Sequence, residues 1–310
     1  MLAFYAIPAA ASNTGAGLSA ERAMRMSFGH FGDICRMIKI EHSIFALPYA
    51  WAGAVLAARG LPPWRALLLL TVAMVAVRSF AMTFNRIADV AIDAENPRTR
   101  GRPLVTGAIS MGQARAFCAV MAAIFIAACA GMNLLCLWLS VPALLFAAAY
   151  SLLKRVSPLC HYWLGATLGL APLAGWISVN PAGMSLAPVL LFFAVTFWVG
   201  AFDIYYAFQD LDCDLAQGLH SIPARYGPVT ALALAGFSHA MTVIFLGLTG
   251  LAAGLGWPWY AICAGIAALL VWEHRLVRPD DLSHINMAFF TLNGIISPVV
   301  LAGVILGLYF

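Results

Sequence analysis

Long runs of apolar residues, separated by polar links, dominate the hydrophobic pattern of the chain. The runs are continuous and do not alternate with polar residues, which is typical of membrane-embedded helices and not of barrel strands. A helix needs about 20 apolar residues to cross a bilayer. Nine segments approach this length, namely 40–59, 64–90, 110–131, 133–153, 159–180, 184–209, 228–252, 258–274 and 285–309. The pattern predicts an all-α, polytopic membrane protein with nine transmembrane helices.

Composition supports the same fold class. Hydrophobic residues make up 63% of the 310 residues and charged residues only 10%, whereas soluble proteins average about 45–50% apolar and about 25% charged residues. The net charge of +4 does not indicate nucleic acid binding, because the basic residues are spread over the links. Seven scattered cysteines without a Cys-x-x-Cys pair predict neither a disulfide framework nor a zinc site.

The first residues differ from the rest of the chain. They are small, polar and rich in Gly and Ala, so we expect a poorly ordered cytoplasmic tail over residues 1–35 and one nine-helix domain over residues 36–310. The placement of Lys and Arg orients this domain. With the N-terminus inside, most of the 17 basic residues fall on the cytoplasmic side, which predicts a multi-pass inner-membrane protein.

Two acidic motifs end two of the predicted helices, 64–90 and 184–209. Their polar side chains recur at helical spacing, in the order Asn85, Asp89 and Asp93, and then Asp203, Asp210 and Asp214. Side chains four residues apart share one face of a helix. The predicted topology places both motifs, and the loops that follow them, on the cytoplasmic side.

Carboxylates at hydrophobic depth are costly and indicate function. Magnesium prefers oxygen ligands and often combines one or two carboxylates with substrate phosphates and water. Two acidic helix ends that face one cavity would each hold a Mg²⁺ ion and share a diphosphate between them. We therefore expect two Mg²⁺ ions, held by Asp89, Asp93, Asp210 and Asp214 with Asn85 beside them.

Basic residues close to both motifs would take the remaining charge of a diphosphate and make it a better leaving group. They are Arg98, Arg100 and Arg102 after the first motif, and Lys154 and Arg155 after helix 133–153. Tyr150 and Lys154 share one helix face. Arg78 lies seven residues before Asn85 on nearly the same face, and at that depth its side chain should face the cavity or an acid. The apolar walls would hold a lipid-like tail, so the composite substrate is an isoprenyl diphosphate.

These elements resemble the UbiA superfamily of intramembrane aromatic prenyltransferases. The spaced Asn and Asp residues, followed by Asn-Pro-Arg-Thr-Arg-Gly-Arg over 96–102, are similar to its first signature. The segment Tyr-Ser-Leu-Leu-Lys-Arg over 150–155 resembles its Tyr-x-x-x-Lys-Arg element, and 210–214 resembles its second acidic motif. The resemblance covers roughly residues 36–309. Segments that begin at 40, 218 and 280 are most similar to the 4-hydroxybenzoate polyprenyltransferase-like branch, and within it to the menaquinone (futalosine-route) enzymes.

The resemblance implies nine helices around a central cavity. It also implies Mg²⁺-dependent transfer of a polyprenyl chain to an aromatic ring carbon in ubiquinone or menaquinone biosynthesis. In this interpretation Asp89, Asp93, Asp210, Asp214 and Lys154 are the catalytic residues. The substrate-binding residues are Asn85, Arg86, Tyr150, Arg155, Arg102, Arg78 and Asp203. One position departs from the family pattern: many members have Asp after the Asn, where this chain has Arg86, which removes a metal ligand and adds a phosphate or acceptor contact.

The partners expected on this basis are a polyprenyl diphosphate, an aromatic acceptor and membrane lipid, with no nucleic acid and no protein partner. The acceptor stays open between 4-hydroxybenzoate and a naphthoate or futalosine type, as does the prenyl chain length. The alternative function is a small-molecule or ion transporter that uses intramembrane acids, although transporters more often place these acids in mid-helix. A soluble-type isoprenoid synthase conflicts with the composition, and haem, chlorophyll or archaeal lipid prenylation are alternatives within the enzyme class.

Overall fold

The computed structural model describes residues 32–38, 46–277 and 293–310, and this part of the chain contains helices and no strand. The helices are α2 (Leu47–Ala58), α3 (Trp64–Ala88), α4 (Val90–Glu95), α5 (Met111–Met132), α6 (Leu134–Leu153), α7 (Cys160–Val179), α8 (Leu186–Ala207), α9 (Leu211–Ala216), α10 (Ile222–Ala253), α11 (Trp257–Leu276) and α12 (Asn293–Tyr309). A 3₁₀ turn, Phe208–Asp210, joins α8 to α9. Residues 32–38 form a further short helix.

Each of the nine predicted segments coincides with a helix in the described part of the chain. Among the described residues, six helices are long and apolar enough to cross a membrane, and α2 and α12 are shorter apolar helices. The all-α membrane fold is therefore confirmed, while the number of nine spans stays a prediction. Most of the predicted tail 1–35 lies outside the described residues, as do residues 40–45 and 280–290, which contributed to the family resemblance.

Glycines on α2 and α7 bring these two helices, and α8, into backbone contact. A Cβ atom added at Gly53 would lie 2.0 Å from the carbonyl oxygen of Pro172, and one added at Gly175 would lie 1.8 Å from that of Ala50. On the other side of α7, a Cβ at Gly165 would lie 2.2 Å from the carbonyl oxygen of Thr196 in α8. Small residues of this kind let membrane helices approach closely where lipid supplies no hydrophobic driving force between them.

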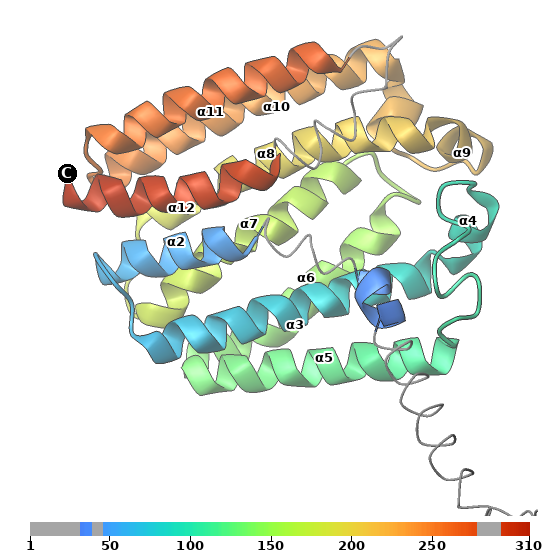
Figure 1. The fold of residues 1–310 in the computed structure, drawn as a ribbon, viewed down its shortest axis with the longest axis horizontal. Coiled ribbons are helices and arrows are strands. Elements are labelled where there is room, and N and C mark those ends of the chain that lie inside the picture. The colour runs from blue at the N-terminus through green and yellow to red at the C-terminus, as the bar shows by residue number, and fades with distance from the viewer. Residues whose placement is uncertain (1–31, 39–45, 278–292) are drawn as a thin grey trace, which may run out of the picture.

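The long helices run side by side along the longest axis of the molecule, and the short helices α4 and α9 lie at the same end of the bundle (Figure 1). The C-terminus lies at the opposite end (Figure 1). This arrangement brings the two acidic motifs together, because α4 follows α3 at this end and α9 follows α8 through the 3₁₀ turn.

Both acidic motifs extend past the predicted helix ends at 90 and 209 into a short second helix, with a break at an aspartate. Asp89 has φ −98° and ψ 7° between α3 and α4, and Asp210 has φ −109° and ψ 6° before α9. These dihedrals fall in the sparsely populated bridge region, where many active-site residues lie. The backbone i to i−4 hydrogen bonds nevertheless continue around Asp89. Its N–H donates to the backbone carbonyl oxygen of Asn85 at 2.9 Å, and the Asp93 N–H donates to that of Asp89 at 2.8 Å. The break therefore turns the chain without moving the first motif to another face.

Candidate active site

A cavity of about 240 Å³ lies between the two acidic motifs, with residues of α3, α4, α6, α7, α8 and α9 in its wall. Eleven of the twelve predicted site residues line it, namely Arg78, Asn85, Arg86, Asp89, Asp93, Arg102, Tyr150, Lys154, Asp203, Asp210 and Asp214. The twelfth, Arg155, contacts Asp89 instead. The polar residues identified by their spacing in the sequence therefore lie at one cavity.

The carboxylate of Asp89 is the centre of the first motif. Its side chain is nearly inaccessible, with 2% of the residue exposed. Lys154 Nζ lies 2.8 Å from Oδ2, Arg155 Nη2 donates to Oδ1 at 2.9 Å, and Asn85 Nδ2 donates to Oδ2 at 3.0 Å. The end of α6 thereby delivers two positive charges to a carboxylate at the end of α3, which compensates its burial.

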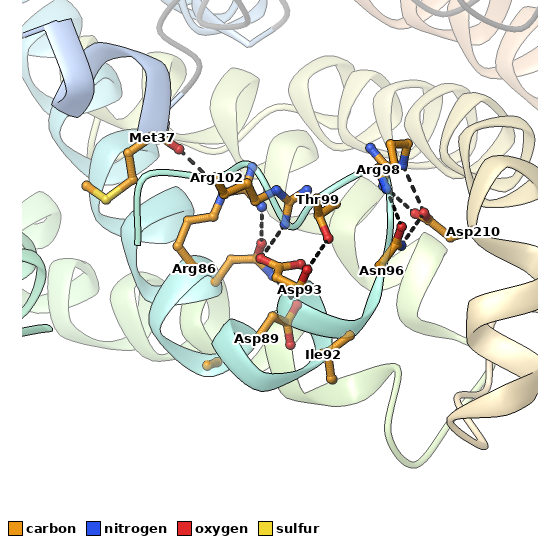
Figure 2. Close-up of polar contacts among 12 residues, drawn as sticks. Met37, Arg86, Asp89, Ile92, Asp93, Asn96, Arg98, Thr99, Arg102 and Asp210 are labelled. Atoms are coloured by element: carbon orange, nitrogen blue, oxygen red, sulfur yellow. Dashed lines mark hydrogen bonds and ion pairs between the residues drawn. The ribbon is translucent and has the colours of Figure 1, made fainter. Parts of the chain in front are cut away.

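Asp93 and the loop after α4 form the second part of this motif (Figure 2). Arg102 Nη1 lies 2.5 Å from Asp93 Oδ2, and the Thr99 hydroxyl donates to the Asp93 carbonyl oxygen at 2.9 Å. Asp93 is buried, with 5% of the residue exposed. The loop therefore folds back over α4 and brings its own guanidinium to the carboxylate.

The same loop reaches the second motif. Asn96 Nδ2 donates to Asp210 Oδ1 at 2.7 Å, and Arg98 Nε donates to the same oxygen at 2.9 Å (Figure 2). Arg98 Nη2 also contacts Asp210 Oδ2, so the guanidinium meets both carboxylate oxygens. Burial acts to lower the pKa of Arg98, but the hydrogen bond to Asp210 and the neighbouring Tyr206 outweigh it, so the pKa lies above its ordinary value. One loop thus connects the two acidic motifs.

Arg86 contacts Asn85 and the N-terminal segment of the chain. Its Nη1 donates to Asn85 Oδ1 at 3.1 Å, and its Nε donates to the Met37 carbonyl oxygen at 3.4 Å. Asn85 in turn donates to Asp89, so Arg86 fixes which way the Asn85 amide points. At the one position that departs from the family pattern, the side chain therefore orients a motif residue and connects it to the short helix of residues 32–38.

Two contributors were not singled out from the sequence. Asn96 was part of the 96–102 segment but carried no assigned role, and its contact with Asp210 depends on a fold that joins residues distant in sequence. His161 carried no assigned role either, and the structure places its Nδ1 at 2.7 Å from Asp203 Oδ2. The polar composition of the loop could have indicated a role for Asn96, but residue spacing could not. No feature of the sequence predicts the contact of His161.

The basic residues contact the acids, whereas the sequence predicted that they would face a diphosphate. Asp89, Asp93 and Asp210 each contact Arg or Lys. Among the described residues, no three His, Cys, Asp or Glu side chains converge as a metal cluster. The donor set still fits Mg²⁺, because it consists of carboxylate and amide oxygens on two sides of one cavity, and Mg²⁺ takes its remaining ligands from phosphates and water.

The fold and the site together define the class: an α-helical membrane protein with a carboxylate-lined cavity at one end of its bundle. A profile described as the UbiA prenyltransferase family matches residues 46–295. The chain belongs to the UbiA prenyltransferase family. The predicted family, fold class and prenyltransferase activity class are thereby confirmed, and the transporter alternative is set aside.

Individual relatives agree with this assignment. The 4-hydroxybenzoate octaprenyltransferase of Azoarcus sp. (strain BH72) is 32% identical over 260 residues, which cover 84% of this chain and 90% of that protein. The apo structure of a UbiA homolog from Aeropyrum pernix K1 has a TM-score of 0.78 and 36% identity, over 86% of this chain and 98% of the other. A UbiA homolog from Archaeoglobus fulgidus, described as bound to GPP and Mg²⁺, has a TM-score of 0.71 and 24% identity, over 90% and 100% of the two chains, and shows likeness of fold.

Proposed function

We propose that this protein transfers a polyprenyl group from a polyprenyl diphosphate to a ring carbon of an aromatic acceptor, in quinone biosynthesis. One observation carries the proposal: Asn96 and Arg98, in the loop after the first acidic motif, hold Asp210 of the second motif. The two motifs therefore border one cavity, as a substrate with two neighbouring phosphates requires. The names of the relatives, 4-hydroxybenzoate octaprenyltransferases, support the same reaction.

The diphosphate end of the substrate would lie between the motifs. We assign Asp89, Asp93, Asp210 and Asp214, with Asn85, as the residues that would hold two Mg²⁺ ions. Bound there, Mg²⁺ would supply compensation for the negative charge that develops on the leaving diphosphate. The Mg²⁺ described for the Archaeoglobus homolog supports a divalent ion, and the oxygen donors of this cavity support its placement.

The basic side chains would exchange carboxylate for phosphate contacts. Lys154, Arg155, Arg98 and Arg102 already reach carboxylate oxygens at the rim of the cavity. Phosphate oxygens in the same space would accept the same hydrogen bonds, and guanidinium groups suit them geometrically. The residues of this chain thus bind and orient the diphosphate and make it a better leaving group.

The other end of the cavity suits the prenyl tail and the acceptor. Leu164, Leu168, Val199 and Phe202 form an apolar wall beyond the acids. Arg78 lines the cavity from α3, about 10 Å along the helix from Asn85 at 1.5 Å per residue. Its guanidinium is suited to a carboxylate on the acceptor, such as that of 4-hydroxybenzoate.

We further propose that the acidic end of the bundle faces the cytoplasm across an inner membrane. The support is the predicted bias of Lys and Arg to this side, which is the usual signal of orientation. The polar substrates would then reach the cavity from the cytoplasm, while the tail stays within the bilayer.

Purified protein in detergent tests the reaction. It is incubated with Mg²⁺, a polyprenyl diphosphate and one of three acceptors: 4-hydroxybenzoate, a dihydroxynaphthoate or an aminodeoxyfutalosine-type compound. Mass spectrometry should reveal a prenylated product with 4-hydroxybenzoate. A product with only one of the other two would replace the acceptor in the proposal, and no consumption of diphosphate with any acceptor would refute the reaction.

A further inference from the structure

His161 lines the cavity beside Asp203, contacts its carboxylate, and also contacts the start of α10. The histidine lies in the first turn of α7 and is 3% exposed. Its Nδ1 atom is 2.7 Å from Asp203 Oδ2, and its Nε2 atom accepts the backbone N–H of Ile222 at 3.1 Å. One imidazole thus connects α7, α8 and α10 at the wall of the cavity.

The backbone contact determines the tautomer of His161. A ring nitrogen that accepts an N–H carries no proton of its own. Nε2 is therefore unprotonated, so Nδ1 holds the ring proton and donates it to Asp203 Oδ2. The imidazole is neutral in this geometry and acts as a hydrogen-bond donor that fixes the rotation of the carboxylate. In other His–carboxylate pairs, too, the hydrogen bond at one ring nitrogen determines the role of the other.

Asp203 differs in its partner from three of the four proposed metal-binding acids. Asp89, Asp93 and Asp210 each contact a permanently charged side chain. Asp203 contacts a neutral donor through Oδ2 alone, and among the described residues no hydrogen bond reaches its Oδ1. A carboxylate held in this way leaves one oxygen available to a group inside the cavity.

Position separates Asp203 from the diphosphate end. It precedes Asp210 by seven residues, which is about 10 Å along a helix at 1.5 Å per residue. The cavity-lining residues of α8 that precede it, Val199 and Phe202, are apolar, whereas Tyr206 and Ala207 line the cavity between it and Asp210. Asp203 therefore lies between the acidic ends and the apolar wall, at the depth where an acceptor ring would meet the first carbon of a prenyl chain.

We propose that Asp203 accepts the proton that the acceptor ring loses, and that His161 is the positioning residue for this base. The inference rests on the proposed prenyl transfer. In that reaction the prenyl C–O bond breaks and its electron pair leaves with the diphosphate, while a ring π pair forms the new C–C bond. The ring C–H bond then breaks, its electron pair restores the aromatic ring, and the proton passes to Asp203 Oδ1 and from there to water.

Substitution of His161 in the full-length protein tests the inference. His161→Phe removes both hydrogen bonds, and kcat should fall about 10- to 100-fold, the range found when outer partners of functional side chains are removed. The KM for the polyprenyl diphosphate should stay near that of the wild type, because the diphosphate lies at the acidic end. His161→Gln, whose amide can donate to Asp203 and accept from Ile222, should recover part of the lost rate.

A kinetic isotope effect separates positioning from general damage. With 4-hydroxybenzoate deuterated at the ring positions next to the hydroxyl, His161→Phe should show a larger deuterium effect on kcat than the wild type, because removal of the ring proton becomes slow. Asp203→Asn keeps an oxygen for His161 but cannot take up the proton, so kcat should fall by about 10²-fold or more. This variant tests the base even if His161→Phe does not fold.

The matched control is His239→Phe, since His239 is also buried, with 5% exposed, but does not line the cavity. It should keep the wild-type kcat and isotope effect. A folded His161→Phe protein with the wild-type kcat, or with a lower kcat and no change in isotope effect, would overturn the role of His161; an Asp203→Asn variant at full rate would overturn the base. A wild-type protein that transfers no prenyl group would instead overturn the proposed function itself.

Discussion

Lys154 Nζ lies 2.8 Å from Asp89 Oδ2, so the Tyr-x-x-x-Lys helix end and the first acidic motif meet at one buried carboxylate. Both groups were predicted to bind the same diphosphate, one through a metal ion and one directly. Their contact places an ammonium and a carboxylate within reach of one bound phosphate. The two predicted roles therefore become testable through substitutions on either side of this contact.

Loss of a single motif carboxylate should abolish most of the activity. We expect Asp89→Asn and Asp210→Asn each to lower kcat/KM by about 10²-fold or more, the size of the loss when one group that stabilises developing charge is removed. Steady-state prenyl transfer measures the effect. Asp212→Asn is the control, because Asp212 is exposed and does not line the cavity. Full activity in both motif variants would contradict the assignment of these residues as metal ligands.

Arg98 and Arg100 differ in their contacts, although they are two residues apart. Arg98 meets both oxygens of Asp210, whereas Arg100 is exposed and does not line the cavity. A hydrogen bond to a charged group contributes about 1.5–3 kcal/mol. Arg98→Ala should therefore raise the KM for polyprenyl diphosphate by about 10- to 100-fold, and Arg100→Ala should leave it nearly unchanged. Equal effects of the two substitutions would mean that only the loop charge matters.

A double-mutant cycle tests whether Arg86 acts through Asn85. Arg86→Gln and Asn85→Ala should each weaken binding of the diphosphate, because Arg86 orients the amide that contacts Asp89. If they act as one unit, the double variant should be no worse than the more affected single variant. Additive losses would show that Arg86 contacts the substrate independently. The measurement is the KM for the prenyl diphosphate at saturating acceptor.

Removal of divalent ions should stop the reaction. A chelator should reduce prenyl transfer to background, and added Mg²⁺ should restore it, because the carboxylates supply oxygen ligands of the kind Mg²⁺ prefers. Titration of Mg²⁺ into protein with inorganic diphosphate should give about two ions per chain, one for each acidic motif. A stoichiometry of one would show that the second motif binds no metal, and turnover in the chelator would exclude the metal-dependent mechanism.

The glycine contact between α2 and α7 should be a stability determinant. Gly175→Ala places a Cβ atom against the Ala50 carbonyl oxygen, so the helices must separate, at a cost of about 1–3 kcal/mol or more. Thermal unfolding in detergent should show a lower midpoint. Gly265→Ala in α11 is the matched control, because no atom lies within 4 Å of the added Cβ and alanine favours the helix. Equal midpoints for the two variants would show that α7 can shift without loss.

The apolar runs of the sequence were sufficient for the helices, and the four-residue spacing was sufficient for the shared cavity. The spacing of residues determines which side chains share one face of a helix. The cavity lies between such faces, so the residues that line it could be predicted. It could not report the helix breaks at Asp89 and Asp210, since both acids continue the helical spacing on either side. Backbone dihedrals there depend on packing against other helices.

The charge pairing was also beyond the sequence. Arg98, Arg100 and Arg102 look alike in the loop, yet Arg98 contacts Asp210, Arg102 contacts Asp93 and Arg100 faces outward. The choice depends on the path of the loop between α4 and α5. The contact between His161 and Asp203 likewise joins two helices, 42 residues apart in the chain, and no local pattern encodes it.

The contact between Arg98 and Asp210 also bears on the order in which the parts of the cavity are synthesised and assembled. The two residues are 112 positions apart, whereas Arg102 is only nine residues from Asp93. Because a ribosome makes the chain from its N-terminus, the loop that carries Arg98 exists before α8 and α9 emerge, and domains commonly begin to fold in that order. The second acidic motif thus enters a membrane in which its basic partner is already present, while the cavity stays incomplete until the third quarter of the chain has been synthesised.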